Sequence, residues 1–105
     1  MTIDTPPPFA ETDRVVDNPE RSRFELFADG QLLGFLTYRA AGGVLLLDHA
    51  EIDPACSGEG RGAQLVRGGL DDLMRRGFVI RPTCPFVVRF IDEHPEYQGL
   101  VARDR

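Results

Sequence analysis

Polar and apolar residues alternate with a period of two from Arg23 to Ala28, which predicts a β-strand. Two further strands are predicted from Leu32 to about Arg39 and from Val44 to Ile52. The dipeptides Asp29-Gly30 and Gly42-Gly43 separate the three stretches and favour tight turns. We therefore expect these strands to form an antiparallel meander.

The pattern changes to a helical period after residue 60. Apolar residues recur at intervals of three and four, which predicts an amphipathic helix from Gln64 to Arg76 with Gly77 at its C-terminal cap. The apolar positions are Ala63, Val66, Leu70, Leu73 and Met74. Gly68-Gly69 inside this helix costs about 1 kcal/mol per glycine relative to alanine. We expect that the helix backbone packs closely on the sheet at these glycines.

A short strand and a second helix follow. Phe78 to Arg81 is predicted to be a strand, parallel to the third strand if the first helix is the crossover between them. Pro85 favours the first turn of a helix, and His94-Pro95 ends that helix. Its apolar face is expected to contain Phe86, Val87, Phe90 and Ile91. Beyond it, Leu100 and Val101 are candidates to dock on the sheet.

These elements fit one domain. Residues 1–14 are interpreted as a flexible lead-in, because Pro6-Pro7-Pro8 cannot join the interior of a sheet. Residues 15–105 are expected to form a single domain. The predicted fold class is α/β of the α+β kind, with an antiparallel meander, one added parallel strand, and helices packed on the sheet.

Composition and charge exclude some classes of function and partner. The 105-residue chain has a formal net charge of −5, whereas general nucleic-acid binders are normally basic, so we expect no nucleic-acid partner. No apolar run approaches the roughly 20 residues of a membrane span, and the N-terminus lacks the features of a secretory signal. Two cysteines, Cys56 and Cys84, do not make a disulfide framework. We expect a cytoplasmic protein with free thiols and no metal site; the pattern leaves the oligomeric state open.

The turn between the third strand and the first helix is the strongest chemical feature. Its sequence is Ser57-Gly58-Glu59-Gly60-Arg61-Gly62-Ala63, at a point where backbone N–H groups of a helix N-terminus are available to a phosphate. No Gly-Lys-Ser/Thr follows, so it is not a Walker loop. No acidic residue stands about 20 positions further on, as a dinucleotide fingerprint requires. A flexible connection is the alternative, and Arg61 within the turn favours anion binding.

The turn and its surroundings resemble the GNAT N-acetyltransferase superfamily, whose acetyl-coenzyme A signature is Arg/Gln-x-x-Gly-x-Gly/Ala. Aligned on its glycines, the signature falls on Ser57 to Gly62. More narrowly, the chain resembles the small single-domain YjdJ-like members over about residues 15 to 101. The similar segments are Asn18 to Glu25, Asp48 to Glu51, Pro82 to Phe86 and His94 to Tyr97. The resemblance implies a mixed, strongly bent sheet, with acetyl-coenzyme A in a cleft where two parallel strands splay apart.

The same resemblance implies a set of cofactor contacts. Backbone from Glu51 to Asp53 pairs with the pantetheine arm, which makes Ile52 and Asp53 cofactor-binding residues. The turn holds the pyrophosphate through Ser57, Gly58, Glu59, Gly60, Arg61, Gly62 and Ala63. Ser57 stands where the superfamily usually has Arg or Gln. Phosphate binding is therefore expected to depend on N–H groups from about Gly58 to Ala63, helped by Arg61.

The resemblance also implies an amine acceptor and a base that takes its proton. Glu51 stands at the superfamily-like position for that base. His49 lies on the same strand face and is a second candidate, because an imidazole titrates near neutral pH. The structural alternatives are a solvated carboxylate for Glu51 and a hydrogen-bonded sheet residue for His49.

Cys84 is the third catalytic candidate. It stands where the superfamily commonly has an Asn that binds the cofactor arm, and a helix N-terminus favours the thiolate form of a cysteine. It is expected to contact the cofactor, and a transient acetyl-thioester on its sulfur is a further hypothesis. A small buried hydrophobe is the alternative.

The general acid is left open by the sequence. The superfamily position of a proton-donating Tyr falls at Ile91, which cannot donate a proton, so Cys84, Tyr97 and water are the alternatives. A rival interpretation is a non-catalytic acyl-coenzyme A-binding or protein-interaction module. It is favoured by Ile91, by Ser57 and by the small amount of chain left to build a pocket for the acceptor. The main expectation is an acetyl-coenzyme A-dependent N-acetyltransferase with an unidentified amine acceptor and no membrane partner.

Overall fold

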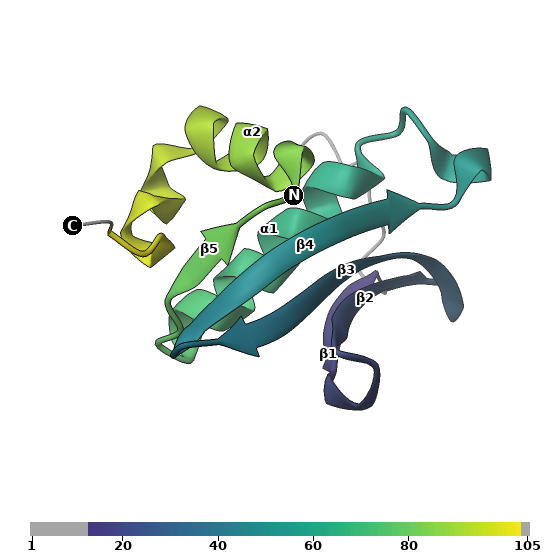
Figure 1. The fold of residues 1–105 in the computed structure, drawn as a ribbon. Coiled ribbons are helices and arrows are strands. Elements are labelled where there is room, and N and C mark those ends of the chain that lie inside the picture. Colours follow the sequence, from purple (N-terminus) through teal and green to yellow (C-terminus); the bar gives the residue numbers. More distant parts are fainter. Residues whose placement is uncertain (1–12, 104–105) are drawn as a thin grey trace, which may run out of the picture.

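The computed structural model describes residues 13–103. Its five-stranded sheet has the order β1-β2-β3-β4-β5, so each strand lies beside its neighbour in the sequence (Figure 1). The strands are β1 (Arg14–Asn18), β2 (Arg23–Ala28), β3 (Gln31–Ala41), β4 (Val44–Ile52) and β5 (Ile80–Pro82). The first four pair antiparallel and β5 pairs parallel with β4, which confirms the predicted mixed sheet.

Two α-helices complete the fold. Helix α1 (Arg61–Arg75) is the crossover between β4 and β5, and α2 (Pro85–Glu93) follows β5 directly. Short 3-10 helices cover Pro19–Arg21, Pro54–Cys56 and Pro95–Leu100. After the last of these, Val101 forms a parallel bridge with Ile80, which confirms that the tail docks on the sheet. None of the described helices has the length and apolar character needed to cross a bilayer.

Several predicted boundaries need correction. No strand was predicted before Arg23, but β1 begins at Arg14, a residue that was assigned to the lead-in. The rest of the predicted lead-in, residues 1–12, lies outside the described part of the chain. The last strand begins at Ile80 instead of Phe78 because Phe78 and Val79 are partly exposed in the connection from α1. Helix α1 begins at Arg61, so it already includes the end of the glycine turn.

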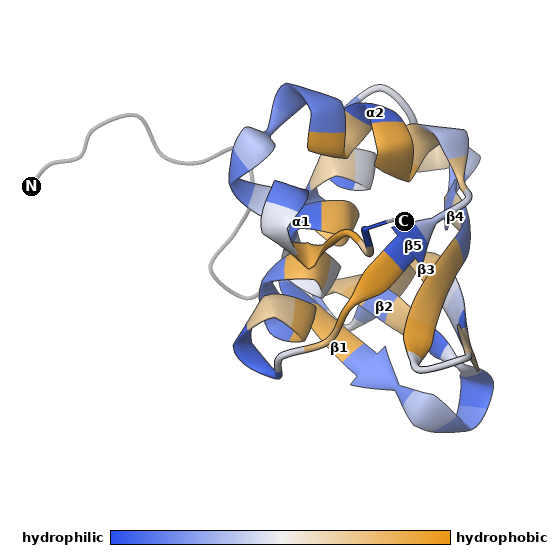
Figure 2. Cartoon of the chain, turned by 60° about the vertical axis from the view of Figure 1, so that its left-hand side comes forward, coloured by the Kyte–Doolittle hydropathy of each residue, from blue (hydrophilic) through white to orange (hydrophobic). Residues whose placement is uncertain are grey.

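The core lies between one face of the sheet and the helices, whose apolar sides face inward (Figure 2). Close approach of α1 explains Gly68-Gly69, as predicted. A Cβ built at Gly68 would lie 2.6 Å from the Cβ of Val15 in β1, and one at Gly69 would lie 3.3 Å from the ring of Phe24. The two glycines therefore let the helix backbone contact β1 and β2.

A bulge in β4 sets which side chains leave the core. Thr37 pairs with His49 and Tyr38 pairs with Leu47, so Asp48 is the extra residue. Leu47 before the bulge is fully buried, and Ala50 after it also packs against the core. His49 and Glu51 consequently share the opposite face, as predicted. Asp48, which was expected to share a face with Ala50, instead bonds through its carboxylate to Arg39 and Thr83.

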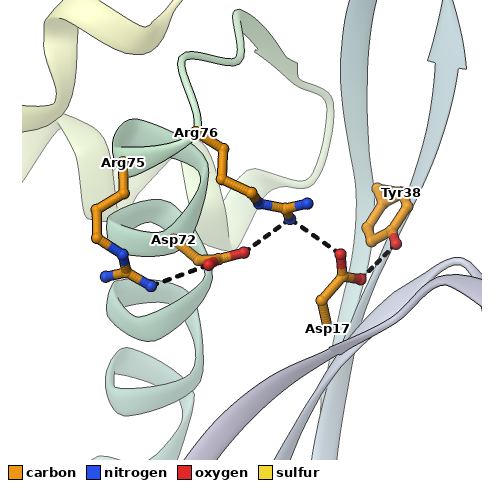
Figure 3. A network of polar contacts seen from close by, with 5 residues as sticks. All are labelled: Asp17, Tyr38, Asp72, Arg75 and Arg76. Atoms are coloured by element: carbon orange, nitrogen blue, oxygen red, sulfur yellow. Dashed lines mark hydrogen bonds and ion pairs between the residues drawn. The ribbon is translucent and has the colours of Figure 1, made fainter.

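A polar network fixes the C-terminal end of α1 to β1 and β3 (Figure 3). Arg76 donates to Asp17 of β1 at 2.9 Å and forms an ion pair with Asp72 at 2.7 Å. Tyr38 of β3 donates its hydroxyl to the same Asp17. Burial and the neighbouring carboxylate raise the pKa of Tyr38 well above its ordinary value. This network secures β1 at the edge of the sheet, where few apolar residues are available to do so.

Candidate functional site

The parallel strands β4 and β5 diverge at Leu47. Its carbonyl accepts the backbone N–H groups of Thr83, at 2.9 Å, and Cys84, at 3.1 Å. The Thr83 hydroxyl also lies 3.0 Å from the carboxylate of Asp48. The last β4–β5 pair joins Leu47 and Pro82, and in the described part of the chain no strand pairs with that edge of β4 from Asp48 to Ile52. The edge of β4 beyond Leu47 is therefore open where β5 ends, which is the opening that the expected cleft between two parallel strands requires.

The glycine turn joins the end of β4 to α1. Gly58 and Gly60 have φ angles of 85° and 82°, a left-handed conformation that favours glycine. Gly60 is the N-cap residue of α1, and the N–H of Gln64 makes the first intrahelical bond, to the Gly60 carbonyl, at 3.1 Å. The N–H groups of Arg61, Gly62 and Ala63 consequently have no acceptor within the helix. These three donors at the positive end of the helix dipole are suited to an anion.

A cavity of about 460 Å³ lies between this turn and α2. Ser57, Gly58, Gly60, Arg61, Gly62 and Ala63 line one side. Ile52 and Cys56 line it from the end of β4 and the short helix that follows. The cavity therefore brings together most of the residues predicted to bind a cofactor. Glu59 does not line it: its exposed side chain makes a 3.9 Å ion pair with Arg61.

The side chain of Arg61 is held by neighbouring groups. Its Nη1 donates to the carboxylate of Asp13 at 2.6 Å and to the side-chain oxygen of Gln64 at 2.8 Å. Only 16% of the Arg61 side chain and 4% of the Asp13 side chain are exposed. The positive charge expected to assist phosphate binding is thus largely neutralised by a buried carboxylate.

The open edge of β4 offers backbone groups beside the cavity. The N–H of Asp53 is bound to the Leu33 carbonyl of β3 at 2.7 Å, and its side chain caps the following short helix by accepting from Ala55 at 3.0 Å. Since hydrogen-bonding directions alternate along a strand, the backbone of Ile52 points the other way, toward the open edge. Of the two predicted edge contacts, the geometry favours Ile52.

His49 and Glu51 form a hydrogen-bonded pair on the sheet face opposite α1. The His49 Nε2 and Glu51 Oε1 atoms are 3.1 Å apart, and the two side chains are 60% and 61% exposed. Phe35 of β3 contacts the pair, with its ring centroid 6.3 Å from that of His49. The strand places a carboxylate and an imidazole, hydrogen-bonded and open to solvent, beside its unpaired edge. Such a pair can accept a proton.

Cys84 is the N-cap residue of α2, directly after the divergence point. Only 6% of the residue is exposed, and it belongs to the apolar core. Its position at a helix N-terminus agrees with the prediction, but its burial agrees with the small-hydrophobe alternative. Cys56, the other thiol, is partly exposed at the cavity.

Ile91 stands at the superfamily position of the general acid, and Tyr97 is one of the alternatives beside Cys84 and water. Ile91 is buried. Tyr97 donates its hydroxyl to Asp71 at 2.6 Å and accepts from Arg67 at 3.0 Å. Burial and the hydrogen bond to Asp71 raise the pKa of Tyr97 to about 12. Tyr97 therefore acts as a fixed link between α1 and the C-terminal segment.

Sequence reasoning missed the far wall of the cavity. It is formed by α2 and the residue that follows, through Phe86, Arg89, Phe90, Glu93 and His94. The spacing of three and four residues in this set is that of one helical face, and this spacing is the signal in the sequence that points to the wall. From the sequence, this helical face was assigned to the apolar core alone. Phe86, assigned there to the core, is 38% exposed and packs against the turn at Gly62.

Comparisons with known proteins agree with this fold. The family model for GCN5-related N-acetyl-transferase matches residues 23–100. A GCN5-like protein from Staphylococcus aureus has a similar structure, with a TM-score of 0.65 and 16% identity over 91% of this chain and 94% of that one. The ribosomal-protein-alanine N-acetyltransferase of Brucella melitensis has a TM-score of 0.51 and 20% identity, over 79% of this chain and 62% of its own. No curated protein matches the sequence.

Proposed function

Since the chain belongs to the GCN5-related N-acetyltransferase family, we propose that it transfers the acetyl group of acetyl-coenzyme A to the nitrogen of an amine. The observation that carries the proposal is the divergence of β4 and β5 at Leu47. The edge of β4 is thereby open between two features. The cavity with its anion-binding N–H groups lies on the sheet face that carries α1, and the His49–Glu51 pair lies on the opposite face.

The residues present fit coenzyme A. The N–H groups of Arg61, Gly62 and Ala63 would bind its pyrophosphate, and the open edge at Ile52 would pair with an amide of the pantetheine arm. Cys84 and Leu47 flank the inner end of that edge. When bound, the coenzyme supplies an acetyl group activated as a thioester.

The role proposed for His49 and Glu51 is proton acceptance. An amine is protonated at neutral pH and is nucleophilic only after it loses that proton. Glu51 attracts the ammonium group and His49 accepts the proton, with their hydrogen bond fixing the imidazole relative to the carboxylate. Exposure of the pair to solvent lets an acceptor approach from the face that the cofactor cavity does not use.

Cys84 is proposed to line the inner end of the cofactor site through its backbone position. Its burial in the apolar core argues for a packing contact, and a transient acetyl-thioester on its sulfur is the weaker alternative. Mass spectrometry after exposure to acetyl-coenzyme A tests this. An acetyl group on Cys84, lost in Cys84→Ala together with turnover, would establish the covalent route.

The main experiment separates binding from chemistry. The protein is incubated with acetyl-coenzyme A and a panel of primary amines, and the acetylated amine is quantified by mass spectrometry. We expect amine-dependent product, and we expect Glu51→Gln and His49→Gln to lower kcat roughly 100-fold or more. Because both side chains lie on the face opposite the cavity, the Kd for coenzyme A should stay within about twofold of the parent value.

A non-catalytic acyl-coenzyme A-binding module is the second candidate. Buried Ile91 and the hydrogen-bonded Tyr97 favour it, because neither supplies a proton to the departing thiolate. Tight coenzyme A binding without product from any amine would support the module. Absence of coenzyme A binding would reject both functions.

A further inference from the structure

The cofactor cavity contains two arginines with different surroundings. Arg61, in the turn, is bound to Asp13 and Gln64 and is mostly buried. Arg89, on α2, lines the opposite wall and is exposed. Among the residues that the structure describes, none makes an ion pair or hydrogen bond with the Arg89 side chain. A full positive charge thus faces the cavity from the helix that sequence reasoning took only for a core element.

The packing of α2 brings this charge close to the glycine turn. Phe86, in the first turn of α2, packs so closely on Gly62 that a Cβ built there would lie 3.0 Å from the Phe86 Cζ atom. Arg89 is three residues further on, and residues three apart on a helix are neighbours on one face. Arg89 therefore projects from the same face, one helical turn from the point where the two helices touch.

We propose that Arg89 is the side chain that binds a phosphate of the coenzyme, across the cavity from the backbone N–H groups of the turn. The inference rests on the proposed function. A helix N-terminus carries only about half an elementary charge, whereas a coenzyme diphosphate carries more negative charge than that. Ser57 contributes no charge and Arg61 is already neutralised by Asp13. A guanidinium opposite the turn supplies the missing charge in a geometry suited to phosphate oxygens.

Two acidic residues around the cavity oppose the binding of an anion by Arg89. Glu93 lines the same wall, four residues after Arg89, and Glu59 lies on the turn. Both repel an anion. Removing the charge of Glu93 should therefore tighten coenzyme binding.

The test is a binding titration of the full chain by calorimetry. Arg89→Gln should raise the Kd for coenzyme A roughly 10-fold or more, Arg89→Lys should recover part of the loss, and Glu93→Gln should lower the Kd. The matched control is Arg21→Gln, which removes the same charge from an exposed position in the β1–β2 connection. Circular dichroism checks folding, and both arginines are exposed, so neither change disturbs the core.

Repeating the titrations with dephospho-coenzyme A identifies which phosphate group of the coenzyme Arg89 binds. An equal loss with both ligands assigns Arg89 to the pyrophosphate, and a loss with coenzyme A alone assigns it to the 3′-phosphate. If Arg89→Gln binds coenzyme A as tightly as Arg21→Gln does, the assignment of Arg89 is wrong while the proposed function stands. If the parent protein itself does not bind coenzyme A, the proposed function fails first.

Discussion

Replacing Gly68 by alanine adds one methyl group where α1 meets β1. The new Cβ would lie 2.6 Å from both the Cβ and Cγ2 atoms of Val15, far inside normal contact distance. Alanine gains about 1 kcal/mol of helix propensity over glycine. Overpacking costs typically about 1–3 kcal/mol. Because the obstacle includes the Val15 Cβ, a rotamer change cannot relieve it and β1 must move, so we expect net destabilisation of up to about 2 kcal/mol.

Gly69→Ala is the matched control, since it makes the same change one residue further along the same helix. Its Cβ would meet Phe24 and Leu36 at 3.3 to 3.4 Å, a tight but tolerable contact. With the propensity gain included, we expect the stability of this variant to stay within about 1 kcal/mol of the parent. Urea unfolding at 25 °C measures both. With an m-value of about 2 kcal/mol/M, a difference of 2 kcal/mol separates the two midpoints by about 1 M.

A Gly68→Ala variant as stable as Gly69→Ala, or more stable, would contradict this prediction. That result would mean that β1 is not held against α1 in solution, or that it moves away at no cost. A midpoint shift at constant m-value would locate the effect in the folded state, whereas a lower m-value would indicate that β1 had detached.

Two further predictions concern the sheet and the tyrosines. In Gly34→Ala, the new Cβ would overlap the Glu51 carbonyl oxygen and approach the Ile52 side chain, so we expect a loss of about 1–3 kcal/mol in urea unfolding and impaired amine acetylation; an unchanged midpoint would contradict this. The pKa of Tyr97 is raised from its ordinary value of 10.0 to about 12, so its contribution to stability should be complete below pH 10 and lost as the pH rises toward 12. Tyr97→Phe should reduce this alkaline loss, measured as the difference in unfolding free energy between pH 9 and pH 11.

Much of the fold could be predicted from the sequence because its strands and turns are locally determined. Asp29-Gly30 adopts the positive φ angles of a tight hairpin turn, and β2 and β4 have the predicted bounds. β1 was missed because its five residues show little alternation and because the side chains that hold it against α1 are distant in the sequence. Val15 packs on Gly68, and Asp17 binds Arg76, which follows the end of α1. The pairing partner β2 is close in the sequence, but these contacts with α1 come from residues more than fifty positions away and leave no local pattern.

In the candidate site, too, some features could be predicted from the sequence and others could not. The glycine turn was visible because its conformation demands glycine, and the resemblance to a known family pointed to His49 and Glu51. The state of Arg61 was not visible, because it depends on Asp13, a residue outside any motif and distant in the sequence. Arg89 was overlooked because one face of α2 combines core residues with cavity residues, and hydrophobic periodicity alone does not separate them.

The order of strands across the sheet, which follows the order along the chain, has a consequence for how the protein assembles. β1 to β4 pair through short connections, so the meander requires only modest loop-closure entropy and we expect its pairing to form early. The longest connection within the sheet is the crossover through α1 that brings β5 beside β4. The cavity forms at that joint, between the end of β4 and α2, and therefore takes shape last. Under this expected order of assembly, a ligand bound across the cavity would slow unfolding much more than it would speed folding, because its contacts would form after a transition state centred on the meander.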